Sequence, residues 1–595
     1  MSATLPVLTA VMDGVRPWLE TVATAAAPTP AVPTPTPTPA TFGANVIGFS
    51  FLLSLVVWAP VVMAAVTAIL PEARPGQSRT LLGVAFWTNA LSLALVIIGY
   101  QQFQAYTSGL QFEENLPWLP ALGISYHLGV DGIGMAMLLL NSLVGLAASI
   151  ASWDVRERGR LYFVMLLLTQ TTVNGAVVSR DLFVLVLFWA ASTVPIAILV
   201  AGYAGPRRLG AAGRLLAYWG VGTGALLAGV LLLYWGAGSN TFDIGMLAGA
   251  TISPRVELVA GALIALAAAT RLPIVPFHSW ATGVLAEAPA GVVVLVAGSA
   301  SRLGGFVLVR LLAGITHDAA RTLAPFLGAL AALTVIYAVL AALNSNDVRR
   351  LAAYLALVPG GVTVLGVAGL TPLALDGTVM LLFAGGLAAA LVAGSAATLT
   401  ERAQARSLGL AAGLAGRIPK LSWLLLIGCL AVLGVPFLAT WASGLMVFLG
   451  TFRTQPGAAF MVAIGLVLGA AASARLMHRV VFGAPNPDAP IPSDASLADA
   501  WYLGILVGAL LWVGMLPSGP KLFGIAIVDP GLVNIVNTTT ADLASTYATT
   551  PTPSPSPSPR PSPGPTPTPI PTPTPTPSAS ASASASPAPS PSQSP

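Results

Sequence analysis

The sequence predicts an all-α membrane protein that crosses the bilayer many times. Of its 595 residues, 55% are hydrophobic and only 8% are Asp, Glu, Lys or Arg, and the mean hydropathy is +0.83. Soluble domains carry about 25% charged residues, so this composition excludes an ordinary soluble protein. Apolar runs of the length that a membrane-spanning helix needs also recur along most of the chain.

We expect about fourteen membrane-spanning helices from these runs. In chain order they are 44–70, 80–100, 130–151, 161–178, 181–203, 212–236, 257–276, 284–313, 322–343, 350–369, 374–399, 421–449, 458–482 and 500–517. In the connecting loops and tails, sixteen basic residues fall on one side and eight on the other. Because cytoplasmic loops are richer in Arg and Lys, the first side is predicted to be cytoplasmic. An even number of spans then places both termini outside the cytoplasm.

Segments of different composition flank the apolar region and define the predicted domains. Residues 1–43 form an N-terminal extension with a Pro/Thr-rich linker, and 44–520 form the transmembrane domain. A C-terminal segment follows at 521–548, and a Pro/Ser/Thr-rich tail occupies 549–595. Such low-complexity sequence has little apolar surface to bury, so we expect the tail to be disordered.

Several chemistries are excluded by residue type and spacing. The single cysteine, Cys429, cannot form an internal disulfide or hold an iron–sulfur cluster. The four histidines, His127, His278, His317 and His478, are too scattered for a zinc motif. The chain has no glycine-rich nucleotide motif, and its basic residues form no nucleic-acid patch. We therefore expect no cofactor, no metal and no nucleic-acid partner; the expected surroundings are the lipid bilayer.

Two arginines, Arg271 and Arg302, lie inside predicted spans. A charge at this depth costs about 2.5–3.5 kcal/mol on insertion scales, so each arginine needs a reason. One interpretation is a buried ion pathway. The other is a structural arginine that snorkels or joins two helices.

The segment that follows Arg271 is predicted to break its helix. Pro273 and Pro276 remove two backbone donors within four residues. Broken helices survive at membrane depth only when they are buried or line a wet cavity, and transporters place ion sites there. His278 comes next and Glu287 follows it. His278 could shuttle protons near neutral pH, or it could be held by a freed backbone carbonyl.

A second break is predicted in the twelfth span, where GVPFLATWASG at 434–444 places Pro436 among small residues. The two broken spans are five helices apart, which indicates a five-helix repeat whose second copy is inverted. Asp131 begins the third span in YHLGVDGIG. A carboxylate there favours the helix dipole, so helix capping is the alternative to a pathway role.

Five stretches carry a resemblance to a known family. They are YHLGVDGIG at 126–134, RLPIVPFHSWATGVLAEAP at 271–289, SRLGGFVLVR at 301–310, NDVRRLAAYLALV at 346–358 and ASARLMHRVVFG at 472–483. With these the chain resembles the antiporter-like membrane subunits of proton-pumping NADH:quinone oxidoreductase (respiratory complex I), closest to the M-type subunit. The resemblance covers about residues 44–520 and is most specific in the second stretch.

The resemblance implies two inverted five-helix repeats with broken seventh and twelfth helices. It also implies a mid-membrane line of polar residues that carries protons, driven by quinone reduction in partner subunits. In M-type subunits the line runs from a glutamate in the fifth helix, through lysines in the seventh and eighth, to a glutamate in the twelfth. The corresponding positions here are Ala190, Arg271, Arg302 and Gly444, and Val358–Gly361 replaces a histidine-containing motif of the tenth helix.

These departures predict a degenerate proton path. Arginine keeps its proton where a buried lysine can release it, and Ala190 removes the counter-charge of Arg271. Glu287 is the best remaining acidic partner for Arg271 in the sequence. The candidates for a proton path are Arg271, Arg302, His278, Glu287 and Asp131.

The predicted function is therefore a membrane-arm subunit of a complex I-like NADH:quinone oxidoreductase, without a redox site of its own. Its expected partners are the other membrane subunits of that assembly. Two alternatives share the same fold. One is a non-transporting structural or assembly subunit, and the other is a subunit of a multisubunit cation/proton antiporter.

Overall fold

The computed structural model describes residues 51–71, 78–104, 109–155, 157–238, 240–409, 412–484, 493–515, 521–522, 525–526 and 531–548. The predicted N-terminal extension and the Pro/Ser/Thr-rich tail lie outside these residues. The predicted transmembrane domain is described from residue 51 onward, with short gaps.

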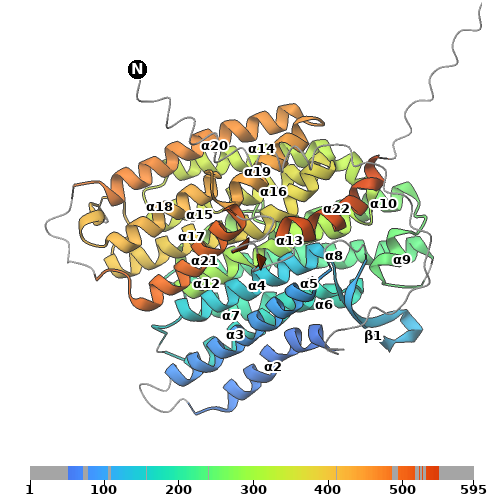
Figure 1. Ribbon diagram of the computed structural model, residues 1–595, viewed down its shortest axis with the longest axis horizontal. Coiled ribbons are helices and arrows are strands. Elements are labelled where there is room, and N and C mark those ends of the chain that lie inside the picture. Colours follow the sequence, from blue (N-terminus) through green and yellow to red (C-terminus); the bar gives the residue numbers. More distant parts are fainter. Residues whose placement is uncertain are drawn as a thin grey trace, which may run out of the picture. The chain divides into compact units, whose positions relative to one another are not determined.

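The chain between residues 51 and 484 is built almost entirely of helices, most of which run side by side in Figure 1. The first seven are α2 (Leu52–Ile69), α3 (Ser78–Gln102), α4 (Gly132–Ala151), α5 (Gly159–Val178), α6 (Leu182–Ala191), α7 (Thr193–Tyr203) and α8 (Arg208–Ala237). The next nine are α9 (Ile244–Ala248), α10 (Pro254–Arg271), α11 (Ser279–Glu287), α12 (Ala290–Gly298), α13 (Leu303–Val307), α14 (His317–Asn344), α15 (Val348–Leu355), α16 (Val358–Gly369) and α17 (Pro372–Ala403). The last are α18 (Pro419–Leu433), α19 (Ala439–Phe452), α20 (Pro456–Leu476), α21 (Leu497–Met515) and α22 (Leu532–Ala548).

The architecture is that of a multi-pass membrane protein, which confirms the predicted fold class. Twelve helical segments in the described part of the chain are long and apolar enough to cross a membrane. Four helices that are not among these twelve, α10 with α11 and α18 with α19, meet in pairs at the predicted breaks. The exact total of fourteen and the inverted repeats stay predictions.

Both predicted helix breaks are confirmed. Helix α10 ends at Arg271 and α11 begins at Ser279, with the two prolines between them. Helix α18 ends at Leu433, Gly434 takes a left-handed conformation with φ of +68°, and α19 begins at Ala439. One boundary was wrong: residues 284–287, expected at the start of the eighth span, belong to α11, because Pro289 separates them from α12.

Further interruptions were not predicted, and one of them divides the tenth span into α15 and α16. The fifth span divides at Ser192 into α6 and α7. The eighth span ends its regular helix at Gly298, makes a 3-10 turn over Ala300–Arg302, continues as α13 and finishes as a π-helix over Leu308–Ala313. Pro195, three residues after Ser192, was a signal for the division of the fifth span, because a proline removes a backbone donor from a helix.

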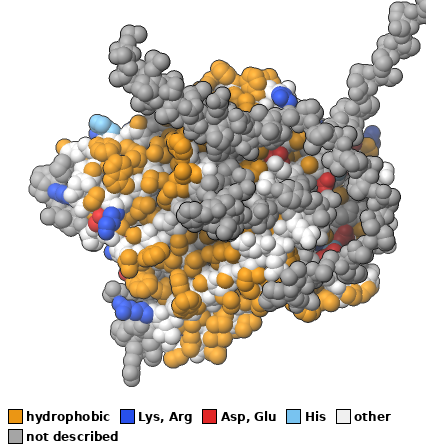
Figure 2. All heavy atoms as spheres, viewed as in Figure 1, with side chains coloured by type: hydrophobic (Ala, Val, Ile, Leu, Met, Phe, Trp, Pro, Cys, Tyr) orange, Lys and Arg blue, Asp and Glu red, His pale blue; other side chains and the backbone are white. Residues whose placement is uncertain are grey.

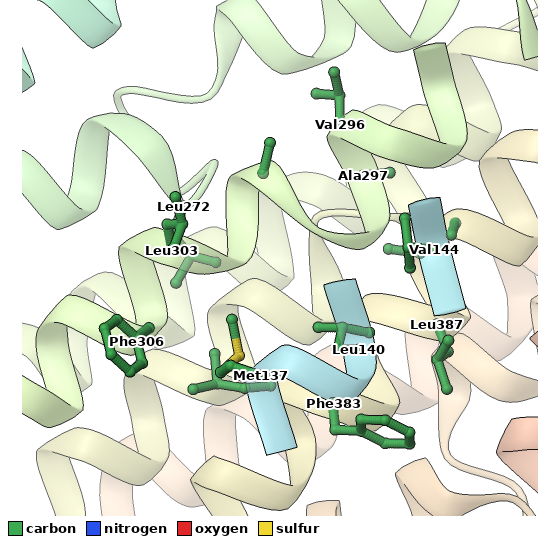
Figure 3. Close-up of a cluster of buried hydrophobic side chains, with 14 of the residues drawn as sticks. Met137, Leu140, Val144, Leu272, Val296, Ala297, Leu303, Phe306, Phe383 and Leu387 are labelled. Atoms are coloured by element: carbon green, nitrogen blue, oxygen red, sulfur yellow. The ribbon is translucent and has the colours of Figure 1, made fainter. Parts of the chain in front are cut away.

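The core lies where α4, α12, α13 and α17 meet (Figure 3). Buried side chains from all four helices interdigitate there, among them Met137, Leu140, Val296, Phe306 and Phe383. Small residues let these helices approach closely, as is common between membrane helices. A Cβ at Gly386 would lie only 2.5 Å from the carbonyl oxygen of Gly298, so α17 and α12 touch through their backbones.

Elements outside the spans cover one end of the bundle. A β-hairpin, absent from our prediction, pairs β1 (Gln111–Leu119) antiparallel with β2 (Ile124–Val130). A second, short pair joins β3 (Lys521–Leu522) and β4 (Ile525–Ala526). Helix α22 packs on α4 and α17. In Figure 2, basic side chains gather mostly toward the left edge and acidic ones toward the right, with a broad hydrophobic surface between them.

Candidate functional site

Arg271, the last residue of α10, is fully buried and is held by neutral groups. Its Nη1 donates to the carbonyl oxygen of Trp189 at 3.0 Å, its Nε to that of Ala300 at 3.3 Å, and its Nη2 to the hydroxyl of Ser192. Its guanidinium carbon lies 4.3 Å from the ring centroid of Trp189 and 4.0 Å from that of Trp219. Among the described residues, no carboxylate forms an ion pair with it.

Interrupted helices supply these acceptors. Trp189 and Ser192 lie at the division between α6 and α7, and Ala300 lies in the 3-10 turn after α12. Trp219 comes from α8, and its ring packs edge-on against Trp280 with centroids 5.0 Å apart. Where a helix is interrupted, carbonyl oxygens become available to side-chain donors. Two separate helix interruptions therefore supply acceptors to Arg271, which itself ends α10 at a third.

Glu287 is not the partner of Arg271, so that prediction was wrong. Its Oε2 lies 3.5 Å from Nη1 of Arg406. Glu287 is the last residue of α11. The helix rises about 12 Å over the eight residues from Ser279 to Glu287, so the carboxylate lies away from the break. Ala190, where the resembled family has a glutamate, directly follows Trp189 and leaves no acid beside the guanidinium.

Arg302, the second arginine in the spans, lies in the 3-10 turn and is also buried. Its Nε donates to the carbonyl oxygen of Ala297 at 3.2 Å, and its Nη1 has no hydrogen-bond partner within the described part of the chain. The bond from Arg271 to Ala300 brings the two arginine-bearing segments together. Neighbouring Leu303 belongs to the apolar cluster in Figure 3, so Arg302 lies beside an apolar core.

His278, directly before α11, is half-buried. Its ring packs edge-on against Tyr337 with centroids 4.7 Å apart. Its Nδ1 lacks a hydrogen-bond partner in the described structure. No hydrogen bond among the described residues links His278 to Arg271.

Asp131 belongs to a different cluster, and its predicted capping role is confirmed. It is the N-cap of α4, where its Oδ1 accepts a hydrogen bond from the Gly134 amide at 2.9 Å. Both carboxylate oxygens also accept from Arg310, one of them at 2.6 Å from Nη2. Arg180 lies 3.6 Å away. This acid is thus held by two cations, in contrast to Arg271, which has no acid.

The second break borders an apolar cavity of about 440 Å³. Gly444 and Pro359 both line it, so the positions that carry a glutamate and a histidine motif in the resembled family face the same space. A Cβ at Gly444 would meet nothing within 4 Å. No ionisable side chain lines the cavity, and Thr440 contributes a buried hydroxyl without a partner in the described residues.

Comparison with known proteins decides the family. Residues 179–470 match the family "NADH:quinone oxidoreductase/Mrp antiporter, TM". An NAD(P)H-quinone oxidoreductase chain 4 of Synechococcus sp. (strain JA-3-3Ab) is 30% identical over 444 residues, which cover 73% of this chain and 83% of the relative. The chain belongs to this family of antiporter-like subunits. A chain 4 of Acaryochloris marina is 27% identical over 513 residues, 83% of this antiporter-like subunit and 96% of that relative.

Solved structures share the fold of this antiporter-like subunit. A chain of respiratory complex I from Thermus thermophilus superposes with a TM-score of 0.72 at 25% identity, covering 83% of the subunit and 99% of that chain. A chain of the Mrp complex from Dietzia sp. DQ12-45-1b reaches a TM-score of 0.73 at 20% identity, covering 84% and 98%. These relatives belong to multisubunit membrane complexes, so this subunit has membrane-subunit partners.

Two buried polar sites were missed in the sequence. Asp376 in α17 is buried and accepts a hydrogen bond from Thr540 of α22. Arg349 in α15 donates to Thr400 at 2.6 Å, to the carbonyl of Ala288 at 2.9 Å and to Glu401 at 2.7 Å. Asp376 is an acidic residue inside an apolar run of the sequence. This signal should have added it to the candidate site residues, together with Arg271 and Arg302.

Proposed function

We propose that this antiporter-like subunit belongs to the membrane arm of a complex I-like quinone oxidoreductase and that its own proton path is closed. The names and coverage of its relatives support the first part. The observation that carries the second part is the cage around Arg271, whose members are two carbonyls, a hydroxyl and two indole rings. The subunit would then serve the complex by its fold and contacts.

A proton relay needs a group that releases its proton and a neighbour that takes it. The guanidinium of an arginine stays protonated at accessible pH. Carbonyl oxygens and indole rings accept hydrogen bonds or cation contacts but do not hold a transferred proton at neutral pH. A fixed positive charge in a narrow polar passage also opposes the entry of cations. The first break therefore favours a plug over a relay.

The second break supports the same proposal because it lacks ionisable groups, whereas the first break holds a fixed cation. Its cavity of about 440 Å³ has no ionisable lining residue. Empty apolar cavities stay dry, whereas a proton wire needs water that is held by two to four polar partners. Thr440 supplies one hydroxyl, which is too few to hold such a chain.

Location and topology follow from the charge distribution. We place the subunit in the cell membrane with the arginine-rich loops in the cytoplasm and both termini outside. The Pro-rich tails would then be extracytoplasmic. Protease added to cells stripped of outer layers should trim them, and protection of the tails until the membrane is opened would contradict this topology.

A second candidate is a subunit of a cation/proton antiporter, because the fold matches the Mrp complex with a TM-score of 0.73. Affinity purification of the chain from its own membranes separates the two. Quinone-site and hydrogenase-like partners support the oxidoreductase. Partners with only transporter folds and no redox subunits support the antiporter.

The closed path is tested with the parent complex reconstituted in vesicles, by measuring protons taken up per electron transferred to quinone. His278→Gln and Thr440→Val remove the titratable or polar groups nearest the two breaks and keep side-chain volume. We expect assembly and the proton-to-electron ratio to match the unmodified complex. A reduced ratio in a fully assembled variant would show that this subunit pumps. Arg271→Leu is a further test variant. If this variant assembles normally but loses proton movement, the proposal that Arg271 closes the path is contradicted.

A further inference from the structure

A cavity of about 790 Å³ opens between α3 and α21, with α4 behind it. Helix α4 contacts both α3 and α21. The lining residues on α3 run from Arg79 to Trp87, and those on α21 from Leu497 to Ile505. Eight residues of helix rise make each wall about 12 Å deep. That depth is close to half of the ~30 Å hydrocarbon core, so the cavity has the reach of one lipid leaflet.

Charged and aromatic groups lie at one end of this cavity. Arg79 is exposed and has no ion-pair partner among the described residues. Arg402 also lines the cavity, and its Nη2 lies 2.7 Å from Asp499 and 3.3 Å from Asp154. Trp153 lies at this end beside Asp154, Trp501 lies about halfway along the α21 wall and Trp87 lies at the deep end of the α3 wall, and each indole is at least half exposed. Tryptophan is enriched where acyl chains meet headgroups.

Apart from Ser496, the rest of the lining is apolar. Leu82, Phe86, Leu146 and Ile150 contribute hydrocarbon walls. A Cβ at Gly83 would meet nothing within 4 Å, so the α3 wall is open at that point. Beyond Ile505 the cavity continues only as a smaller one of about 370 Å³.

We propose that this cavity is a phospholipid site, with the headgroup phosphate bound by Arg79 and the acyl chains between α3 and α21. The ligand class follows from the distribution of charge, because an unpaired guanidinium lies at the mouth and hydrocarbon lines the depth. Basic pockets between membrane helices bind lipid headgroups in this manner. The acidic Asp154 at the same mouth suits a headgroup that also carries an amine.

The dimensions favour a lipid over a membrane helix from a partner subunit. A helix that spans the bilayer needs about 20 residues of continuous groove. Here the larger cavity ends at Ile505, a separate cavity of about 370 Å³ follows, and Tyr100 packs against Trp512 with ring centroids 6.3 Å apart further along. A lipid in one leaflet needs only the larger cavity.

The test uses membranes that contain the intact parent complex and a phosphatidylethanolamine with a photoreactive diazirine near the end of one acyl chain. After illumination and purification, adducts on the peptides that contain residues 82–87 and 497–505 are quantified by mass spectrometry. Gly83→Phe fills the cavity and should reduce these adducts about tenfold. Gly220→Phe is the matched control, because a Cβ at Gly220 of α8 also meets nothing within 4 Å and that glycine lies outside the cavity.

Headgroup binding is tested separately with Arg79→Gln, which should also lower adduct yield, whereas Arg255→Gln on an exposed helix start should not. Arg79→Gln leaves the helix walls unchanged. If the Gly83→Phe variant does not accumulate, Arg79→Gln alone therefore tests whether the cavity binds a phospholipid. Unchanged adducts in both cavity variants would overturn the proposal. Loss of a neighbouring subunit from Gly83→Phe with unchanged adducts would assign the groove to a protein helix instead. The proposal stands independently of whether the subunit pumps.

Discussion

The two broken helices differ in the residues that surround the interrupted backbone. At the first break, Leu272 and Ile274 are fully packed and the preceding arginine bonds to three acceptors. At the second break, Phe437 is 52% exposed and the neighbouring Gly444 faces an apolar cavity. One break is filled with a buried cation and the other holds no charge at all.

This difference shows that proline and glycine suffice to break the helix, without any ion chemistry. Pro273 and Pro436 remove backbone donors in the two segments. Gly434 supplies the left-handed φ of +68° that ends α18. A broken-helix architecture can therefore form around a break that holds no ionisable group. At the first break, the hydrogen bonds of Arg271 join the fifth, seventh and eighth spans.

The largest expected effect tests that structural role. Arg271→Ala should lower the free energy of unfolding by about 2–4 kcal/mol, because several buried acceptors lose their donor. Unfolding can be followed with a thiol-reactive dye, since Cys429 is the sole cysteine and is fully buried. Gly444→Ala, at the open site of the second break, should stay within about 0.5 kcal/mol of the unmodified chain. Equal losses for the two variants would remove the distinction between the breaks.

The next effect asks whether the missing acid can be supplied. Ala190 follows Trp189, whose carbonyl oxygen binds Arg271. Ala190→Glu should form an ion pair with that arginine and show a coupling energy of about 1–3 kcal/mol with Arg271→Leu. Dye-detected unfolding of both single variants and the double variant gives the cycle. Additive changes would mean that the guanidinium is out of reach of position 190.

The sequence predicted the fold better than it predicted the contacts of the site. Apolar runs and prolines located the spans and both breaks, because these depend on local composition. The partner of Arg271 was wrongly taken to be Glu287, because the sequence did not show which helices pack against Arg271 and bring the hydroxyl of Ser192 to it. The ion pair between Asp131 and Arg310 joins residues 179 positions apart, which only the packed bundle reveals.

The third effect places a charge at the empty break. Gly444→Glu has room for its side chain, because a Cβ there meets nothing within 4 Å, but no cation lines the cavity. The variant should be less stable than Gly444→Gln by about 1 kcal/mol or more, because an unpaired carboxylate loses more hydration than an amide. The dye assay compares the two at equal protein concentration. Equal stability would indicate that water already fills this cavity.

The smallest effect concerns His127 and its two carboxylate partners, one of which precedes α10, the helix that ends at the first break. Nδ1 of His127 on the hairpin lies 2.8 Å from Asp243, eleven residues before α10 begins, and Nε2 lies 2.8 Å from Glu113. Burial alone would lower the pKa of His127, but the hydrogen bonds to these two carboxylates outweigh it and raise the pKa above its ordinary 6.5.

The sign of the pH effect follows from that raised pKa. The folded state binds the imidazole proton more tightly than the unfolded chain, so the stabilisation is complete below pH 6.5 and is lost as pH rises through the folded pKa. We expect about 0.5–1 kcal/mol, because the contact is partly solvated. Deuterium exchange in the peptide 124–130, corrected for intrinsic rates, should accelerate with rising pH in the unmodified chain. His127→Gln should exchange fast at every pH, and a pH-dependent response that persists in this variant would assign the effect to another group.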